Sequence, residues 1–474
     1  MRRVCKNCIN DPYLYQEVKF SGLIEPCDYC ERPSQQPTWA LSELADQVHI
    51  AFTHHYERTS DEPEGTEARM HYDKDTDFEF ERKGEETIYA IQNALGCDEE
   101  LAYDLQEFLE EKYNGGRSYK EPDENEYSEY AQYKARPPSD SKWYLNWHSF
   151  VNDLKSKRRF FNKSAHEFLS SLFDGIENMS TSDGEPVVIE AGPESKSEPE
   201  RITGFYRARV FHSKDKLKEA MKRPDLNLGP PPSELAKAGR MNAFGISVFY
   251  GAVTAEGAIA EVRPPVGSLT LAGRFDLVRK IRLLDFNALS KVSESGSIFN
   301  PKYAERFIKS QFLRSFTNQI SLPVMPTDED LEYLATQAVV EFLANALGTK
   351  LDGVLFPSAQ TAEDTVNVVL FRGSSEVKKL SIPQGTEIEA SCSMTQSVGP
   401  EPWYQVTETL PKEKTETDID STNSNGKPTI KVADNSTKDE LKSTLRLNLD
   451  SLEVVDVEKV KYKTNSHKVY RDRR

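Results

Sequence analysis

The sequence has 474 residues, a length that usually divides into two or three domains. Aromatic residues are plentiful, but a hydrophobic fraction of 37% is low for a fully packed chain, so we expect part of it to stay unpacked. The formal net charge of −17 disfavours nucleic acid as a partner of the whole surface, and the sequence contains no apolar run of about 18 residues that would span a membrane.

Residues 1–35 are expected to form a small metal-binding module. They hold four of the six cysteines, as two Cys-x-x-Cys pairs: Cys5, Cys8, Cys27 and Cys30. The N-terminus carries no apolar signal core, so we expect a cytoplasmic protein, in which clustered cysteines favour a metal over disulfides. Four thiolates complete a tetrahedral zinc shell and leave no position for water, so the predicted zinc is structural.

Residues 36–176 are expected to form a mostly α-helical domain. Apolar residues recur at helical spacing in five segments, at about 38–57, 84–96, 98–113, 144–156 and 162–175. An acidic stretch at about 57–82 predicts a loop, and Phe160 and Phe161 are expected to anchor the core. The Gly, Pro, Ser and Glu content of residues 177–200 predicts a linker.

Residues 201–390 change to an α/β pattern, which makes the whole chain an α+β multidomain protein. Strands are predicted at 204–212, 246–253, 268–272, 280–286, 352–356 and 366–371. Helices are predicted at 254–262, with Thr254 as the N-cap, and at about 302–318 and 328–347. We expect residues 393–450 to be disordered and residues 451–474 to return as a β-segment or tail.

Three segments of the α/β region combine charge, aromatic rings and glycine in a way that core packing does not require. They are Tyr206-Arg207-Ala208-Arg209, the Gly239-Arg240-Met241-Asn242 turn with Tyr250 and Glu261 behind it, and Phe356-Pro357-Ser358-Ala359-Gln360 followed by Asn367. In order and spacing these segments resemble the RES domain over about 200–385. The resemblance implies an ADP-ribosyltransferase-like fold, degradation of nicotinamide dinucleotide (NAD), in some members by phosphorolysis, and membership of bacterial toxin–antitoxin pairs.

The chemistry of NAD cleavage assigns a role to each of these side chains. Breaking the nicotinamide–ribose bond builds positive charge on the ribose, which the carboxylate of Glu261 can stabilise. Arg207 and Arg240 suit the pyrophosphate, and Arg209 is expected to face away from Arg207. The ring of Tyr250 or Tyr206 can stack on nicotinamide. Two further side chains, those of Ser358 and Asn367, are expected to orient substrate oxygens, and Asn242 is grouped with the substrate-binding residues.

The helical region resembles the HEPN/RES N-terminal module, which opens an alternative function. HEPN ribonucleases pair an arginine with a histidine a few residues later, and Arg159 and His166 offer such a pair. A noncatalytic zinc-containing interaction protein is a second alternative. For partners, the RES resemblance implies an antitoxin or regulatory protein besides NAD, and a homodimer is the ordinary expectation. The long insert at about 287–330 is expected to be a lid or a partner surface.

Overall fold

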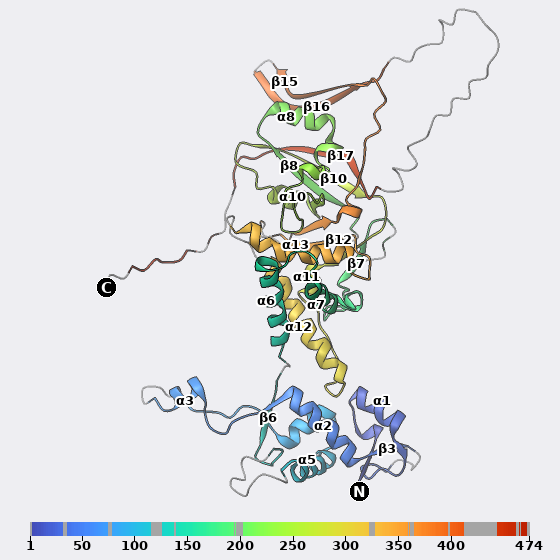
Figure 1. Ribbon diagram of the computed structural model, residues 1–474, viewed down its shortest axis with the longest axis vertical. Coiled ribbons are helices and arrows are strands. Elements are labelled where there is room, and N and C mark those ends of the chain that lie inside the picture. The colour runs from blue at the N-terminus through green and yellow to red at the C-terminus, as the bar shows by residue number, and fades with distance from the viewer. Residues whose placement is uncertain are drawn as a thin grey trace, which may run out of the picture. The chain divides into compact units, whose positions relative to one another are not determined.

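The computed structural model describes residues 2–31, 36–73, 78–114, 126–136, 139–193, 195, 202–321, 328–358, 360, 365–396, 399–411, 443–460, 464 and 466–471 (Figure 1). The chain divides into two compact units. The first comprises Met1–Leu145 and Ser293–Phe312, and the second comprises Asn146–Val292 and Leu313–Arg474. The predicted helical domain at 36–176 therefore crosses the division between the units.

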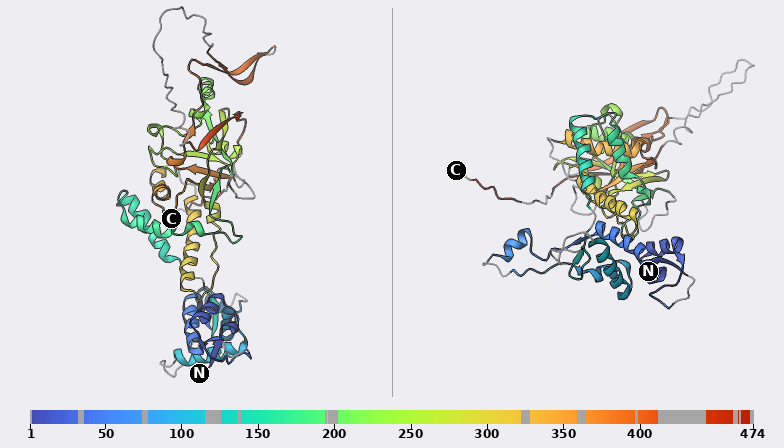
Figure 2. Two further views of the ribbon diagram at one scale, coloured as in Figure 1. Left: turned by 90° about the vertical axis from the view of Figure 1, so that its right-hand side faces the viewer. Right: turned by 60° about the horizontal axis from the view of Figure 1, so that its bottom comes forward.

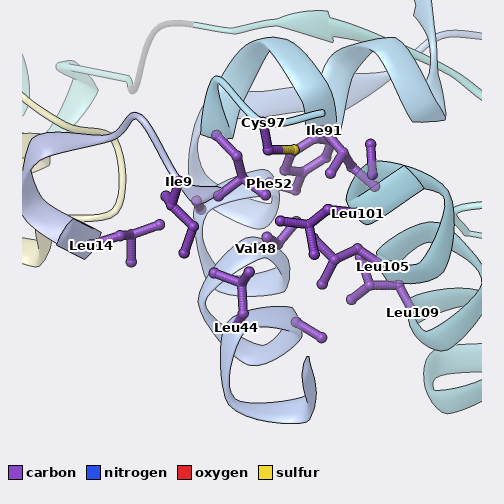
Figure 3. Packing of buried hydrophobic residues seen from close by; sticks show 14 of the residues in the cluster. Ile9, Leu14, Leu44, Val48, Phe52, Ile91, Cys97, Leu101, Leu105 and Leu109 are labelled. Carbon is purple, nitrogen blue, oxygen red and sulfur yellow. The ribbon is translucent and has the colours of Figure 1, made fainter. Parts of the chain in front are cut away.

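The first unit is built on helices, as the apolar spacing predicts. Its main helices are α1 (Pro12–Ser21), α2 (Leu41–His55), α4 (Thr87–Leu95) and α5 (Glu99–Asn114). Figure 3 shows the apolar side chains of α2 and α5, among them Leu44, Val48, Leu101 and Leu105, pointing toward one another in a buried core. Each helix thus buries one stripe of residues, which supplies most of the stability of such helices.

Two small antiparallel sheets accompany these helices. One has the order β1 (Arg3–Cys5), β3 (Pro37–Ala40), β2 (Leu23–Ile24), with the 3-10 turn η1 (Lys6–Cys8) after β1. The other has the order β4 (Tyr56–Arg58), β6 (Gln132–Ala135), β5 (Glu85–Glu86). Strand β4 and helix α3 (Gly65–His71) lie within the stretch expected to be a loop.

The insert at 287–330 contributes to the core of the first unit. Phe299 is buried among the apolar residues of α2, α4 and α5, with Ile298 packed against the same cluster. The Ser297 hydroxyl donates to the carboxylate of Asp11, the N-cap of α1, at 2.8 Å. This part of the insert therefore packs within the chain, whereas the sequence suggests a lid or a partner surface.

The second unit is organised around a nine-stranded sheet. Its order among the described residues is β14-β17-β10-β8-β9-β13-β12-β11-β7. The strands are β7 (Val188–Ala191), β8 (Gly204–Phe211), β9 (Phe249–Ala252), β10 (Leu269–Leu277), β11 (Ile281–Asp285), β12 (Gly353–Pro357), β13 (Val366–Leu370), β14 (Val377–Lys378) and β17 (Leu445–Asp456). All six predicted strands are present.

The sheet is nearly divided in its middle. Strands β8 and β9 share one pair of residues, Tyr206 opposite Ala252, whereas β8 and β10 pair along eight positions. Gly251 lies at this junction, and a Cβ there would come within 2.8 Å of the Tyr206 carbonyl oxygen. The close approach of the two strands therefore requires glycine in the Tyr-Gly-Ala segment.

The remaining helices belong to the second unit, except that α6 and α12 begin in the first. They are α6 (Ser141–Ser156), α7 (Lys163–Phe173), α8 (Lys214–Lys222), α9 (Pro224–Asn227), α10 (Ala255–Glu261), α11 (Phe286–Leu289), α12 (Pro301–Ser321) and α13 (Glu329–Asn345), with the 3-10 turns η3 (Ile176–Asn178), η4 (Ser233–Leu235) and η5 (Arg372–Ser374). No helix in the described parts of the chain is long and apolar enough to cross a membrane.

The expectation that Phe160 and Phe161 anchor the core is wrong. The two side chains are 82% and 104% exposed, because they lie in the bend between α6 and α7. Other rings build the core there: Trp147 and Phe150 of α6, with Phe316 of α12 and Phe342 of α13.

Two segments expected to lack structure contain strands. Val188–Ala191, in the predicted linker, forms the edge strand β7 beside β11. The segment 393–450 predicted to be disordered contains the end of β15 (Glu387–Gln396) and all of β16 (Gly399–Thr409), which form a hairpin beside α8 (Figure 2). It also contains the start of β17, which joins the main sheet. The average composition of these segments does not reveal the strands, because a strand can form when the apolar residues occupy only one of its two faces. Residues 194, 196–201 and 412–442 lie outside the described residues.

Candidate functional site

The four N-terminal cysteines converge on one point. Their sulfur atoms all lie within 4.8 Å of one another, and the distances are 3.7 Å from Cys5 to Cys8, 3.7 Å from Cys5 to Cys30 and 3.8 Å from Cys8 to Cys27. Zinc–sulfur bonds of about 2.3 Å in a tetrahedron place the sulfurs about 3.8 Å apart. The spacing fits a four-thiolate zinc site and is far from the length of about 2.05 Å of a disulfide.

A second group of predicted site residues lies along one row of the divided sheet. Tyr206 of β8 pairs with Ala252 of β9, which pairs with Asn367 of β13, which pairs with Phe356 of β12. Residues directly opposite one another in a sheet share a face. Tyr206 and Ala252 pack on α10, so this row and α10 define one face of the site.

Helix α10 brings Glu261 to this row. The helix begins where predicted, with the Thr254 hydroxyl accepting from the Gly257 amide at 3.1 Å. Glu261 is its last residue, and its carboxylate accepts a hydrogen bond of 2.9 Å from the side-chain amide of Asn367. The Asn367 side-chain oxygen is buried and has no hydrogen-bond partner among the described residues.

The turn that carries Arg240 is fixed from within and from the sheet. Gly239 and Asn242 are bridged by backbone hydrogen bonds. The buried Asn242 amide donates to the carbonyls of Lys237, Ala243 and Ile246 at 2.9, 3.2 and 3.0 Å, so it shapes the turn.

Tyr250 connects this turn to the sheet. Its hydroxyl donates to the Asn242 side-chain oxygen and accepts from the Met241 amide, both at 3.0 Å. Burial is the main cause that raises the pKa of Tyr250, and the Glu261 carboxylate adds to it, whereas the Met241 amide and the Arg240 charge oppose it. Arg240 and Glu261 therefore both lie within electrostatic reach of the Tyr250 hydroxyl.

Arg207 lies where the sheet divides. Its guanidinium carbon is 5.2 Å from the centre of the Phe249 ring, and burial, with the Arg209 charge second, lowers the pKa of Arg207 to about 10. Its Nη1 atom is buried and has no hydrogen-bond partner among the described residues. Such a group is suited to an anionic ligand.

The expectation that Arg209 faces away from Arg207 is wrong, because residues two apart on a strand share a face. Arg209 donates to the Asn227 carbonyl at 3.0 Å, so a neighbouring helix end holds its guanidinium.

Ser358 follows β12 at the same edge of the sheet. Its amide donates to the Thr365 carbonyl at 2.8 Å, and its hydroxyl accepts from the Gln360 amide at 3.2 Å. The register places Ser358 two residues beyond Phe356, which lies opposite Asn367. Ser358 and Asn367 therefore come from neighbouring ends of β12 and β13.

Sequence reasoning missed two residues of α13 that reach the Arg240 turn. The Gln337 side-chain amide donates to the Gly239 carbonyl at 2.8 Å, and the Arg240 guanidinium carbon is 5.9 Å from the centre of the Tyr333 ring. The residues are four apart, so they lie on one face of the helix. That spacing is also common on solvent-facing helices, so the sequence alone gives no signal for their role.

The predicted ribonuclease pair is engaged in local structure. Arg159 donates from Nε to the Leu154 carbonyl at 3.2 Å, near the end of α6. The His166 ring packs edge-on against Phe342, with ring centres 5.6 Å apart. These contacts give the two side chains packing and capping roles.

Comparison with protein families identifies two domains. The RES domain model matches residues 205–390, from β8 into β15, and the HEPN/RES N-terminal domain 1 model matches residues 22–168. The chain therefore carries a HEPN/RES N-terminal domain in front of a RES domain. Searches of curated proteins and of solved structures give no match.

Proposed function

We propose that the RES domain cleaves NAD at the bond between nicotinamide and ribose. The observation that carries the proposal is that Tyr250, which is hydrogen-bonded to the Arg240 turn, lies within electrostatic reach of Glu261, whose carboxylate is held by Asn367 of the sheet, inside the matched RES domain. The RES domain supports a toxin-like role that acts on NAD. We infer an ADP-ribosyltransferase-like fold for the domain on the same grounds.

Glu261 is proposed to stabilise the reacting sugar. Departure of nicotinamide leaves an oxocarbenium-like ribose, and a carboxylate beside it lowers the energy of that charge. The hydrogen bond from Asn367 fixes the orientation of the Glu261 carboxylate, and the second oxygen of the carboxylate remains for a ribose hydroxyl. Asn367 is proposed to act both through Glu261 and through its own unpaired oxygen.

The two arginines are proposed to hold the pyrophosphate. Arg207 offers a buried Nη1 without a partner among the described residues, and a phosphate oxygen would satisfy it. Arg240 lies on the turn that Tyr250 holds through the Met241 amide. The ring of Tyr206 or Tyr250 is proposed to stack on nicotinamide, Ser358 to orient an oxygen of the substrate or acceptor, and Asn242 to keep the turn in place.

The acceptor decides the products. With water, NAD gives nicotinamide, ADP-ribose and a proton. With inorganic phosphate it gives nicotinamide and ADP-ribose 1″-phosphate, and with a protein side chain the ADP-ribosyl group is transferred to that chain. All three reactions share the cleavage of the nicotinamide–ribose bond, and the roles proposed above concern that step.

The test is loss of NAD by purified protein, with and without phosphate, beside Glu261→Gln. The amide of Gln can still accept from Asn367 but carries no charge, so the fold is kept while stabilisation of the cation is lost. We expect a fall in kcat of about a hundredfold or more. A wild-type protein that is folded and zinc-loaded but leaves NAD intact would overturn the proposal and favour a noncatalytic interaction protein.

The N-terminal cysteines are proposed to bind one structural zinc ion. The sulfur geometry supports four thiolate ligands, which fill a tetrahedral shell and leave no position for a water molecule. An antitoxin or regulatory partner, a homodimer and a cytoplasmic location stay predictions.

A further inference from the structure

We propose that helix α13 positions the substrate-binding arginine, with Tyr333 and Gln337 as positioning residues. The inference rests on the proposed function, because it assigns Arg240 to the pyrophosphate. Neither residue belongs to the motifs that the sequence analysis singled out. Both are supplied by α13, a helix that follows the insert and lies between it and β12.

The Arg240 turn is held from three directions. Asn242 ties the turn together from inside, through three backbone carbonyls. Tyr250 holds it to β9, through the Met241 amide and the Asn242 side chain. Gln337 holds the Gly239 carbonyl from α13, at 2.8 Å. Gln337 therefore adds a contact from α13 to Gly239, the residue directly before Arg240.

Tyr333 acts on the guanidinium itself. A cation 5.9 Å from the centre of a tyrosine ring is within the range of cation–π attraction. An arginine side chain otherwise samples many rotamers, and ordering it costs free energy when substrate binds. By holding the guanidinium before NAD arrives, Tyr333 reduces that cost. The aromatic ring provides the attraction, so its hydroxyl is not needed for this contact.

The rest of α13 makes the helix a firm support. Val339, Phe342 and Leu343 are buried, and Phe342 packs against Phe173 of α7 with ring centres 6.1 Å apart. Tyr333 and Gln337 are four residues apart on α13, so both lie on the face of the helix that contacts the Arg240 turn. A change in the position of α13 would move both contacts at once.

This arrangement predicts an effect on KM and not on kcat. The pyrophosphate keeps its charge throughout the reaction, so Arg240 binds the ground state and the transition state alike. Loss of such uniform binding raises KM and leaves kcat unchanged. Glu261, which meets the developing charge, should instead control kcat.

The experiment compares Tyr333→Leu with Tyr333→Phe in the full-length protein, each alone and combined with Arg240→Ala. Tyr333→Leu should raise KM for NAD by about threefold to tenfold, and Tyr333→Phe, which keeps the ring, should stay close to wild type. In the Arg240→Ala background, Tyr333→Leu should cause no further rise, because it acts through the missing guanidinium. Tyr103→Leu, an exposed tyrosine on α5, is the matched control.

The affinity for ADP is measured for the same variants as a second test. ADP carries the pyrophosphate but lacks the bond that is cleaved. An equal effect of Tyr333→Leu with and without Arg240 would overturn the inference, as would a Tyr333→Phe variant as impaired as Tyr333→Leu. A wild-type protein that leaves NAD intact but whose ADP affinity follows the expected cycle would sink the proposed function and support the positioning role. The two failures are therefore distinguishable.

Discussion

At the start of the turn that carries Arg240, position 239 has room only for a hydrogen atom. A Cβ there would lie 2.8 Å from the Asn242 side-chain oxygen and 3.0 Å from the Tyr250 hydroxyl oxygen. These are the two atoms that join the turn to the sheet. The glycine of the Gly-Arg-x-Asn segment is therefore required by the close approach of side chains that position the site.

Gly239→Ala should consequently damage the site more than the fold. The new methyl group forces Asn242 and Tyr250 apart, so we expect at least about a tenfold loss in kcat/KM for NAD, since misplacement of positioning groups is costly. The thermal midpoint should fall only slightly. Gly348→Ala, where the added Cβ meets nothing within 4 Å, is the control. Full activity of Gly239→Ala would show that the turn tolerates the shift and does not position Arg240.

At the scale of elements, a single carboxylate joins the start of β12 to its neighbours. The Asp352 carboxylate accepts from Arg279 at 2.8 Å, from the Ser374 hydroxyl at 2.5 Å and from the Arg282 amide at 2.9 Å. Burial would raise the pKa of Asp352, but these hydrogen bonds outweigh it and hold the pKa below its ordinary value. The charged form is therefore the one that stabilises the sheet.

Asp352→Asn should lower the free energy of unfolding by about 1.5–3 kcal/mol at neutral pH, the range for hydrogen bonds to a charged group. Because the folded-state pKa is depressed, the wild-type advantage is present above the ordinary pKa of about 3.9 and is lost as the pH falls through the folded value. Urea unfolding followed by circular dichroism at neutral and acidic pH measures the difference. An equal loss at both pH values would contradict the assignment, and the exposed Asp450→Asn is the control.

Local signals in the sequence predicted elements well and sheet membership poorly. Helix α10 was predicted with its cap because Thr254 and the apolar spacing behind it are neighbours in the chain. The placement of β17 beside β10 was missed because that pairing joins residues about 177 positions apart, as in the hydrogen bond from the Arg274 amide to Ser451. The same contrast holds for the site. Arg240 and Glu261 belong to local sequence motifs and could be predicted, whereas Tyr333 is recognisable only from the contact of α13 with the Arg240 turn.

At the scale of the whole molecule, the insert makes the N-terminal unit dependent on a segment far away in the sequence. Phe299 is buried in the core formed by α2, α4 and α5, and the Ser297 hydroxyl donates a hydrogen bond to the carboxylate of Asp11. A fragment ending at residue 145 would lack both. A deletion that removes the N-terminal unit would in turn expose Ile298 and Phe299 on the remaining chain. A variant that lacks the N-terminal unit should therefore also carry polar residues in place of these two.

Phe299→Ala in the full-length chain measures how much this segment stabilises the unit. Truncation of a buried phenylalanine costs about 3–5 kcal/mol, so the N-terminal unit should unfold at a lower temperature. Release of zinc from the cysteine cluster during heating, followed with a chelating dye, reports on that unit because all four cysteines belong to it. The exposed Phe160→Ala should release zinc at the wild-type temperature. If Phe299→Ala did so as well, the insert would contact the core without supporting it, and residues 1–145 would be expected to fold alone.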